Sequence, residues 1–488
     1  MSAHPLTIGL DLGTSGVKAV LLAADGSLRA EALAPLELQR PQPLWSEQHP
    51  ADWWAATDLA LRSLRERAKP DDWAHVAALA VAGQMHGAVL IDAAGDVIRP
   101  AILWNDGRSQ AQCAELERRE PATRRITANR TMAGFTAPKL LWVAQHEPAA
   151  FKRVAKVLLP KDWLTFNLSG TMSSDCSDAA GTLWLDVAAR RWSEPMLRAT
   201  GLNLQHMPTL HEGNAPIGRL RDDWARTWGL PKGVVLAAGA GDNAAGAIGV
   251  GVVRPGQGFV SLGTSGVLFV VTASASANPE RGVHTFCHAL PNTWHQMAVM
   301  LSAASSLAWL GGVTGASPAE LLEHVSSEVR EQAPLFLPYL SGERTPHADP
   351  AATASWLGLT AATTRDDLAY AVIEGVAFSF ADGLAALREA GTEPTQLLAI
   401  GGGARSDTWL QLMADTLALP LHRPAGAEVG PALGAARLAQ LAVGLPEAEV
   451  LRTPPVAQSF IPRSSAIAAL AQRLARYRQA YAPTRALS

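Results

Sequence analysis

The sequence predicts an α/β protein of two related domains that face each other across a cleft. The hexapeptide LGTSGV occurs twice, at residues 12–17 and 262–267. Each copy stands between apolar stretches, IGLD and KAVLL around the first and GFVS and LFVV around the second. Strand, glycine turn and strand is the pattern of a β-hairpin, and its repetition indicates two domains of one design. Two unrelated glycine hairpins remain the alternative, because such turns are common.

Length and composition agree with this architecture. The chain has 488 residues, of which 48% are hydrophobic and 17% charged, so it can build two large cores or three smaller ones. The formal net charge is -3 and the basic residues are scattered. We therefore expect no nucleic-acid partner and no membrane partner.

Cysteine usage and the N-terminal residues predict a cytoplasmic protein. The three cysteines lie far apart in the sequence, which is not a disulfide framework. The N-terminal residues MSAHPLTIGLDLG show no secretory signal. The apolar stretch 233–253 carries Asp242 and Asn243 at its centre, so we expect a buried strand, a loop and a helix start rather than a membrane span.

The two hairpins predict a phosphate site. Turn residues leave backbone N–H groups free, and such oriented amides bind anions without a lysine. Glycine lets the backbone approach closely, and hydroxyl groups add donors. The residues concerned are Gly13, Thr14, Ser15 and Gly16 in the first turn and Gly263, Thr264, Ser265 and Gly266 in the second.

One difference between the hairpins predicts the metal side. The first has Asp11 before its Leu-Gly pair, and the second has Ser261. Because Mg²⁺ keeps several waters and needs only one or two carboxylates, Asp11 is the candidate metal residue. The sequence contains no Gly-Lys pair, so a Walker-type phosphate loop is excluded.

Two segments after the first hairpin predict a ligand pocket. Residues 51–68 have helical periodicity, and residues 75–92 indicate two buried strands around a turn that holds Met85 and His86. Ligands bind at strand ends of α/β sheets, although a lone histidine is more often structural. Further on, Trp104, Asn105 and Asp106 combine a flat apolar face with hydrogen-bonding groups, as a sugar site needs. Asp106 near a capped helix start is the alternative.

Asp242 is the candidate general base. A buried strand breaks at Gly-Ala-Gly-Asp-Asn, residues 239–243, and a helix or turn follows. Apolar surroundings raise the pKa of a carboxylate, and a carboxylate at a strand end can accept a hydroxyl proton. An aspartate that merely caps the helix is the alternative.

The second half predicts the nucleotide side. Residues 364–390 form a long helix ended by Gly391, and a buried strand then leads to a turn of three glycines, residues 401–403. Backbone there can contact a flat adenine or ribose, and Ser406 or Asp407 caps the next helix. The segment EVGPALGAARLA opens a helix near Pro431, and residues 464–482 form a terminal helix.

Several segments together resemble the FGGY family of carbohydrate kinases, a branch of the actin-like ATPase superfamily. The resemblance covers about residues 6–445 and rests on IGLDLGTSGVKAVLL, AGQMHG, ILWNDGRS, GFTAPKLLWV, LLPKDWL, SDAAGTLWLD, SLGTSGV, YLSGERTPH and IGGGARSD. It implies an α/β fold of two ribonuclease-H-like domains that flank a hinged catalytic cleft. The expected boundaries are 1–246 for the sugar, magnesium and phosphate side and 247–488 for the nucleotide side with the terminal helix.

The resemblance also implies an activity and residue roles. It implies transfer of phosphate from ATP, with Mg²⁺, to a small ketose, D-xylulose first, and Asp242 as base on the terminal hydroxyl. The sugar residues it implies are Met85, His86, Trp104, Asn105, Asp106 and Asn243. Asp11 would position Mg²⁺, Thr14 and Thr264 would cradle phosphates, and Gly402, Gly403 and Ser406 would face adenosine. The role of residues 134–139 stays unassigned.

Three questions stay open on the sequence alone. The acceptor could be ribulose, 1-deoxy-D-xylulose or glycerol. A different class, an actin-like ATPase that needs no sugar, would require a client-binding domain or polymerisation, and no extra domain is visible. The sequence is compatible with a homodimer but does not fix the oligomeric state.

Overall fold

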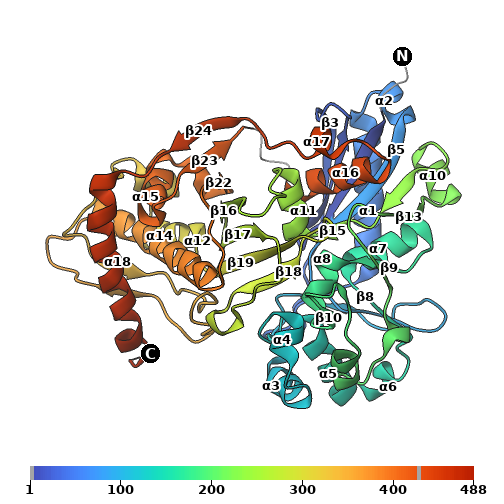
Figure 1. The fold of residues 1–488 in the computed structure, drawn as a ribbon, viewed down its shortest axis with the longest axis horizontal. Helices are drawn as coiled ribbons and strands as arrows, with labels where there is room; N and C mark the ends of the chain where they lie inside the picture. The colour runs from blue at the N-terminus through green and yellow to red at the C-terminus, as the bar shows by residue number, and fades with distance from the viewer. Residues whose placement is uncertain (1–4, 426–429, 488) are drawn as a thin grey trace.

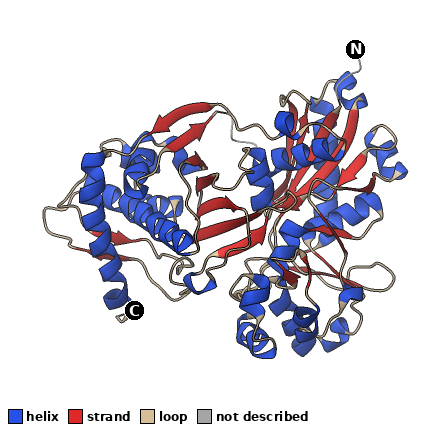
Figure 2. Ribbon diagram, in the orientation of Figure 1, coloured by secondary structure: helices blue, strands red, loops and turns tan. Residues whose placement is uncertain are grey.

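A computed structural model describes residues 5–425 and 430–487 and shows two lobes (Figures 1 and 2). The first lobe holds the N-terminal sheet and a helical region beside it, and the second holds the C-terminal sheet with its helices. The first two residues of the predicted segment EVGPALGAARLA, Glu428 and Val429, lie outside the described residues.

The first sheet grows from the first LGTSGV hairpin. Strands β1, β2 and β3 are antiparallel, whereas β1 pairs with β5, and β5 with β14, in parallel. Leu12 pairs with Val17 where the hairpin closes. Across the sheet the order is β13 (Pro216–Arg219), β14 (Val235–Ala237), β5 (Val76–Gly83), β1 (Leu6–Leu12), β2 (Gly16–Leu22) and β3 (Leu28–Pro35), with β15 (Ala240–Gly241) also on β5.

The second sheet repeats this order from the second hairpin. Strands β16, β17 and β19 are antiparallel, whereas β16 pairs with β22, and β22 with β23, in parallel. Across the sheet the order is β18 (His284–Cys287), β19 (Trp294–Met300), β17 (Gly266–Thr272), β16 (Gly258–Leu262), β22 (Leu397–Ile400), β23 (Leu421–Pro424) and β24 (Val456–Phe460). The hairpins therefore occupy equivalent positions, which confirms the two ribonuclease-H-like domains and shows that unrelated hairpins were the wrong alternative.

Helix α16 (Gly430–Ala442) comes from the second half of the chain but packs on the first sheet. It crosses α11 (Asp242–Gly249), and small residues allow the close approach. A Cβ added at Gly434 would lie 1.7 Å from the Ala245 carbonyl oxygen, and one at Gly9 would lie 1.9 Å from that of Ala432. Helix α16 therefore joins the two lobes, in addition to the chain segment that connects them.

The helical region of the first lobe lies at the lower right in Figure 1. Its core continues into the second lobe, because Phe135 and Trp184 belong to one buried cluster with Phe269 and Phe286. Its main elements are α3 (Gln110–Arg119), α4 (Thr123–Thr127), α5 (Thr136–His146), α6 (Pro148–Phe151), α7 (Pro160–Ser169), α8 (Cys176–Ala179), α9 (Glu194–Ala199), β6 (Val89–Ile91), β7 (Ala101–Ile102), β8 (Lys156–Leu158), β9 (Ser173–Asp175), β10 (Leu185–Asp186), β11 (Arg191–Trp192) and β12 (Thr209–His211). Helices α1 (Pro50–Arg67), α2 (Pro70–Ala74) and α10 (Asp222–Trp228) and strand β4 (Glu47–Gln48) complete the lobe.

Helix α14 (Arg365–Glu389) forms the buried centre of the second lobe, with Thr364 as its N-cap. It is long and apolar enough for a membrane span, but 89% of its most apolar window is buried inside the protein. The terminal helix α18 (Ser464–Arg485) docks on it through Arg473, whose Nε lies 2.6 Å from Glu374. The other elements are α12 (Ala304–Thr314), α13 (Pro318–Leu322), α15 (Asp407–Leu417), α17 (Glu447–Val450), β20 (Leu335–Leu337) and β21 (Ser355–Leu357).

Candidate active site

The structure brings Asp11 and Asp242 together. Strand β15 pairs with β5 next to β1, so the start of α11 lies at the end of the strand that carries Asp11. Burial raises the pKa of Asp11 to about 7, and the charge of Asp242 adds to this effect. Burial also raises the pKa of Asp242 to about 6. The helix cap is Gly241, and Asp242 is the first helical residue, so the alternative of an N-cap aspartate is wrong.

Asn243 holds one oxygen of the Asp242 carboxylate and leaves the other available. The backbone N–H of Asn243 donates to Oδ1 at 2.7 Å, and its side-chain amide donates to the same atom at 2.9 Å. In the part of the chain that the structure describes, Oδ2 accepts no hydrogen bond from protein. The hydrogen bonds to Oδ1 therefore orient the Asp242 carboxylate and leave Oδ2 able to accept a proton, as a general base requires.

A buried charged cluster supports the backbone in front of Asp242. The Gly241 N–H donates to the hydroxyl of Ser177 in α8 at 3.1 Å. Asp175 caps this short helix, and Lys161 Nζ lies 2.9 Å from an oxygen of Asp175. In the sequence this support was signalled by the segments LLPKDWL, which holds Lys161, and SDAAGTLWLD, which holds Ser177, but their roles could not be worked out without the fold.

Met85 lies against Gly241, the residue before Asp242, and the neighbouring His86 lies against Gly181. A Cβ added at Gly241 would lie 2.9 Å from Met85 Cγ. His86 has a left-handed backbone, with φ 70°, and its Nδ1 lies 2.7 Å from the Gly181 carbonyl oxygen. Because that oxygen can only accept, Nδ1 carries the proton and Nε2 is an acceptor. Burial lowers the pKa of His86 to about 3, so the ring is neutral at physiological pH.

Lys139 stabilises the backbone of His86 by a hydrogen bond to its carbonyl oxygen. Its Nζ donates to the His86 carbonyl oxygen at 2.8 Å and to that of Gly134 at 2.7 Å, and the Thr136 hydroxyl donates to the former at 3.1 Å. Burial lowers the pKa of Lys139 to about 7. These contacts give the stretch 134–139 a physical role that the sequence did not reveal, because His86 lies 53 residues before Lys139 in the chain.

The predicted sugar residues of the ILWNDGRS segment take different positions. Trp104 is 45% exposed and donates from Nε1 to the Thr14 hydroxyl at 2.9 Å, and Asn105 is also exposed. Asp106 is buried, and its oxygens accept from Arg108 and from the Ser46 N–H at 2.6 Å. The next helix, α3, begins at Gln110 with Ser109 as its N-cap, so Asp106 lies just before a capped helix start, as the alternative expected.

Both hairpin turns present unused backbone donors. Among the described residues, the N–H groups of Thr14, Ser15, Thr264 and Ser265 donate to no protein acceptor. In the first turn the Gly13 N–H is used, because it donates to the Gly16 carbonyl oxygen at 3.0 Å. In the second, Gly263 and Thr264 use their carbonyl oxygens to accept from the start of α12.

A cavity of about 670 Å³ in the second lobe joins four of the predicted nucleotide residues. Ser406 caps α15 there, accepting from the Trp409 N–H at 3.2 Å, which confirms it as the cap. The predicted residues that line the cavity are Thr264, Gly402, Gly403 and Ser406, and the others include Ala304, Ser305, Leu307, Ala308, Pro318, Leu322 and Trp409. Its size is in the range of small-molecule sites.

Comparison of the sequence with protein families and curated proteins finds carbohydrate kinases. Residues 6–249 match the N-terminal domain of the FGGY family of carbohydrate kinases, and residues 258–443 match its C-terminal domain. The xylulose kinase of Escherichia coli (strain K12) is 50% identical over 478 residues, which covers 97% of this chain and 98% of the relative.

Solved structures agree with the sequence relatives. A xyloylose kinase from Brucella ovis superposes with a TM-score of 0.96 at 47% identity, covering 99% of this chain and 100% of that one. The xylulose kinase from Rhodospirillum rubrum superposes with a TM-score of 0.92 at 28% identity, covering 99% of each chain.

Proposed function

Because this chain belongs to the FGGY family of carbohydrate kinases, we propose that it transfers the terminal phosphoryl group of ATP to D-xylulose, giving D-xylulose 5-phosphate. The observation that carries the chemistry is the oriented Asp242 carboxylate beside Asp11. The relatives named xylulose kinase favour D-xylulose over ribulose, 1-deoxy-D-xylulose and glycerol as acceptor.

Asp242 acts as the general base in this proposal. Its pKa of about 6 keeps it ionised at neutral pH, yet basic enough to accept a proton from the attacking hydroxyl in the transition state. Oδ2 is the atom that takes the proton, since Oδ1 is held by Asn243. Phosphoryl transfer depends mainly on such positioning and on charge stabilisation.

The sugar lies between the Met85–His86 turn and the Trp104 ring in this proposal. The neutral His86 ring offers Nε2 as an acceptor for a sugar hydroxyl, while its Nδ1 stays bound to Gly181. Asn105 and Asn243 complete the proposed contacts. Asp106 contributes through the segment it anchors, since its carboxylate oxygens bind Arg108 and Ser46.

The free N–H groups of the two hairpins, from Thr14 and Ser15 on one side and Thr264 and Ser265 on the other, cradle the phosphates of ATP, and Gly13 and Gly263 let the backbone approach them closely. The adenosine lies in the second-lobe cavity at Gly402, Gly403 and Ser406. Two buried carboxylates, of which Asp242 raises the pKa of Asp11, fit a divalent cation, so Asp11 would hold Mg²⁺. When bound, Mg²⁺ supplies positive charge that offsets the phosphate oxygens.

The proposal also covers the roles of the two domains, the compartment and the oligomeric state. Residues 1–246 supply the sugar, magnesium and phosphate side, and residues 247–488 supply the nucleotide side, with α16 reaching back to the first sheet. The three cysteines are free and buried, which fits the reducing cytoplasm. A homodimer remains a prediction.

The test is ADP release with Mg-ATP and a panel of acceptors: D-xylulose, D-ribulose, L-ribulose, glycerol, gluconate and none. Fast release with D-xylulose alone is expected. Equal release in every tube, including the one without sugar, would identify an ATPase that needs no sugar and overturn the proposal.

A further inference from the structure

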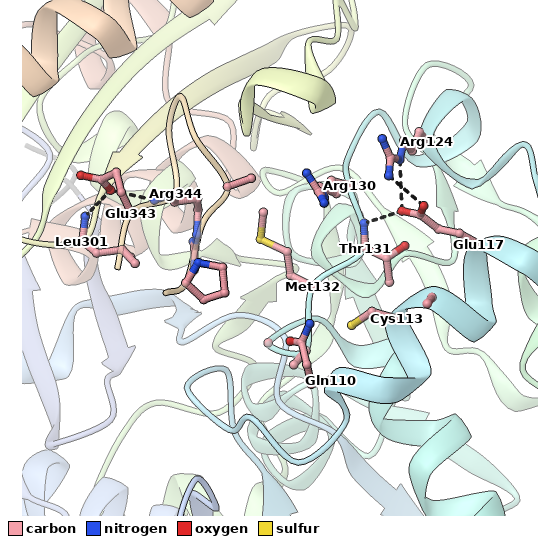
Figure 3. Close-up of a pocket in the computed structure, with 15 residues that line it drawn as sticks. Gln110, Cys113, Glu117, Arg124, Arg130, Thr131, Met132, Leu301, Glu343 and Arg344 are labelled. Carbon is pink, nitrogen blue, oxygen red and sulfur yellow. Dashed lines mark hydrogen bonds and ion pairs between the residues drawn. The ribbon is translucent and has the colours of Figure 1, made fainter. Parts of the chain in front are cut away.

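A second cavity, of about 440 Å³, lies between the two lobes (Figure 3). One wall comes from α3 and residues 130–134 of the first lobe, and the other from Leu301 and residues 343–350 of the second. It shares no lining residue with the nucleotide cavity. It meets the proposed sugar site at Gly134, where an added Cβ would lie 2.5 Å from the Trp104 carbonyl oxygen.

Two arginines bring positive charge to this cavity that no carboxylate neutralises. Within the described residues, the Arg130 side chain has no hydrogen-bond or ion-pair partner. Among the residues that the structure describes, no carboxylate lies within 4.0 Å of the Arg344 guanidinium, which contacts His284 Nε2 at 3.2 Å. Burial lowers the pKa of Arg344, as expected for a cation that lacks a close counter-ion.

The carboxylates that line the cavity do not cancel this charge. Glu117 is paired with Arg124 at 2.9 Å and accepts from the Thr131 N–H. Glu343 is buried and accepts from the N–H groups of Leu301 and Arg344. Burial raises the pKa of Glu343 to about 8, so it is mostly neutral at pH 7.

The rest of the lining suits a small carbon skeleton with hydroxyl groups. Met132, Ala133, Leu301, Ala348 and Pro350 supply apolar walls. The side chains of Gln110 and Thr131 add polar groups, and the Thr131 hydroxyl is buried without a hydrogen-bond partner in the protein. A guanidinium group binds phosphate with two parallel hydrogen bonds, which makes phosphate the anion that two arginines fit best.

The cavity is connected to the proposed sugar site by side-chain contacts. Arg344 contacts His284, the His284 ring lies 5.6 Å from that of Phe135, and Phe135 lies 4.7 Å from His86. An anion that moves Arg344 would therefore act on the ring neighbours of His86.

We propose that this inter-lobe cavity binds a small sugar phosphate, whose phosphate group lies between Arg130 and Arg344 and bridges the two lobes. The site is distinct from the one that carries out phosphoryl transfer. The binding step does not depend on the proposed function, because its determinants lie outside the residues assigned there.

Isothermal titration calorimetry tests this proposal, with D-ribose 5-phosphate as the probe and uncharged D-ribose as its control. The titration is run on the full-length protein, alone and with ADP and D-xylulose present to occupy the proposed active site. Binding of the phosphate ester in both conditions, and none of D-ribose, is expected. Loss of binding when ADP and D-xylulose are present would place the probe in the active site and overturn the proposal.

The variant Arg130→Gln should weaken D-ribose 5-phosphate binding at least tenfold, since a charged hydrogen-bond partner is lost. Arg118→Gln, on exposed α3 surface outside the cavity, removes the same charge and should leave binding unchanged. Thermal unfolding checks that both variants are folded. Equal binding by Arg130→Gln and wild type, or equal affinity for inorganic phosphate and the sugar phosphate, would contradict the assignment.

Discussion

Replacing Asn243 by alanine is expected to shift the acid limb of the pH profile of kcat/KM upward. The side-chain amide of Asn243 donates to Asp242 Oδ1 at 2.9 Å and lowers the pKa of Asp242, which burial nevertheless keeps raised at about 6. The backbone N–H of residue 243 keeps its own bond to the same oxygen in the variant. The carboxylate therefore loses one of its two stabilising hydrogen bonds.

The size of the shift follows from the strength of that bond. A hydrogen bond to a charged group contributes about 1.5 kcal/mol or more, which corresponds to about one pKa unit. An inflection moved from about 6 to about 7 leaves roughly a fifth of the wild-type ionised fraction at pH 6 and nearly all of it at pH 8.5. The pH-dependent loss is therefore about fivefold at pH 6 relative to pH 8.5.

The assay is kcat/KM for D-xylulose between pH 5 and pH 9 at saturating Mg-ATP. Loss of a sugar contact from Asn243 would lower kcat/KM equally at every pH. Only a shift of the acid limb to higher pH therefore tests the role of Asp242 as the base. Asn105→Ala is the matched control, because Asn105 is exposed and the hydrogen bonds that the structure shows on the Asp242 carboxylate both come from Asn243. An acid limb that stays at the same pH in Asn243→Ala would refute the role given to Asn243 and Asp242.

Three further results are expected. Lys139→Met should raise the KM for D-xylulose about tenfold with kcat within threefold, because the carbonyl of His86 loses a buried donor; unchanged KM would reduce Lys139 to a packing role. Asp11→Asn should raise Tm by a few °C at pH 8 and by less at pH 5. The raised pKa of about 7 means that ionising Asp11 destabilises the fold as pH rises from about 4 to 7, by at most about 4 kcal/mol; an equal gain at both pH values would contradict this. Ala308→Trp should raise the KM for ATP at least tenfold without changing that for D-xylulose, because it fills the nucleotide cavity; ATP kinetics like those of wild type would place the nucleotide elsewhere.

The elements that the sequence predicts well are those whose signal is local. The repeated LGTSGV turns predicted both sheets, since hairpin formation depends on the turn and its two flanking strands. The helix expected at residues 364–390 is also confirmed, as α14 (Arg365–Glu389), because helical periodicity is a pattern of neighbouring residues. Ser406 as the cap of α15 is a third case.

The features that the sequence did not reveal depend on contacts between distant residues. Helix α16 is rich in alanine and glycine, so its composition does not indicate which sheet it covers. The hydrogen bond from Trp104 to the Thr14 hydroxyl joins residues 90 positions apart, and that from Lys139 to the His86 carbonyl oxygen joins residues 53 positions apart. The proposed role of Arg130 could not be predicted either, because it depends on the loop that carries Arg344, which lines the same cavity but lies far away in the sequence.

The central claim is that Asp242 is the base of a sugar kinase, and the most direct measurement is turnover and D-xylulose binding in Asp242→Ala. In this variant kcat for D-xylulose is expected to fall about 10²–10⁴-fold, while the dissociation constant for the sugar changes little. Turnover within threefold of wild type would contradict the account, because the proton of the attacking hydroxyl would then have another acceptor.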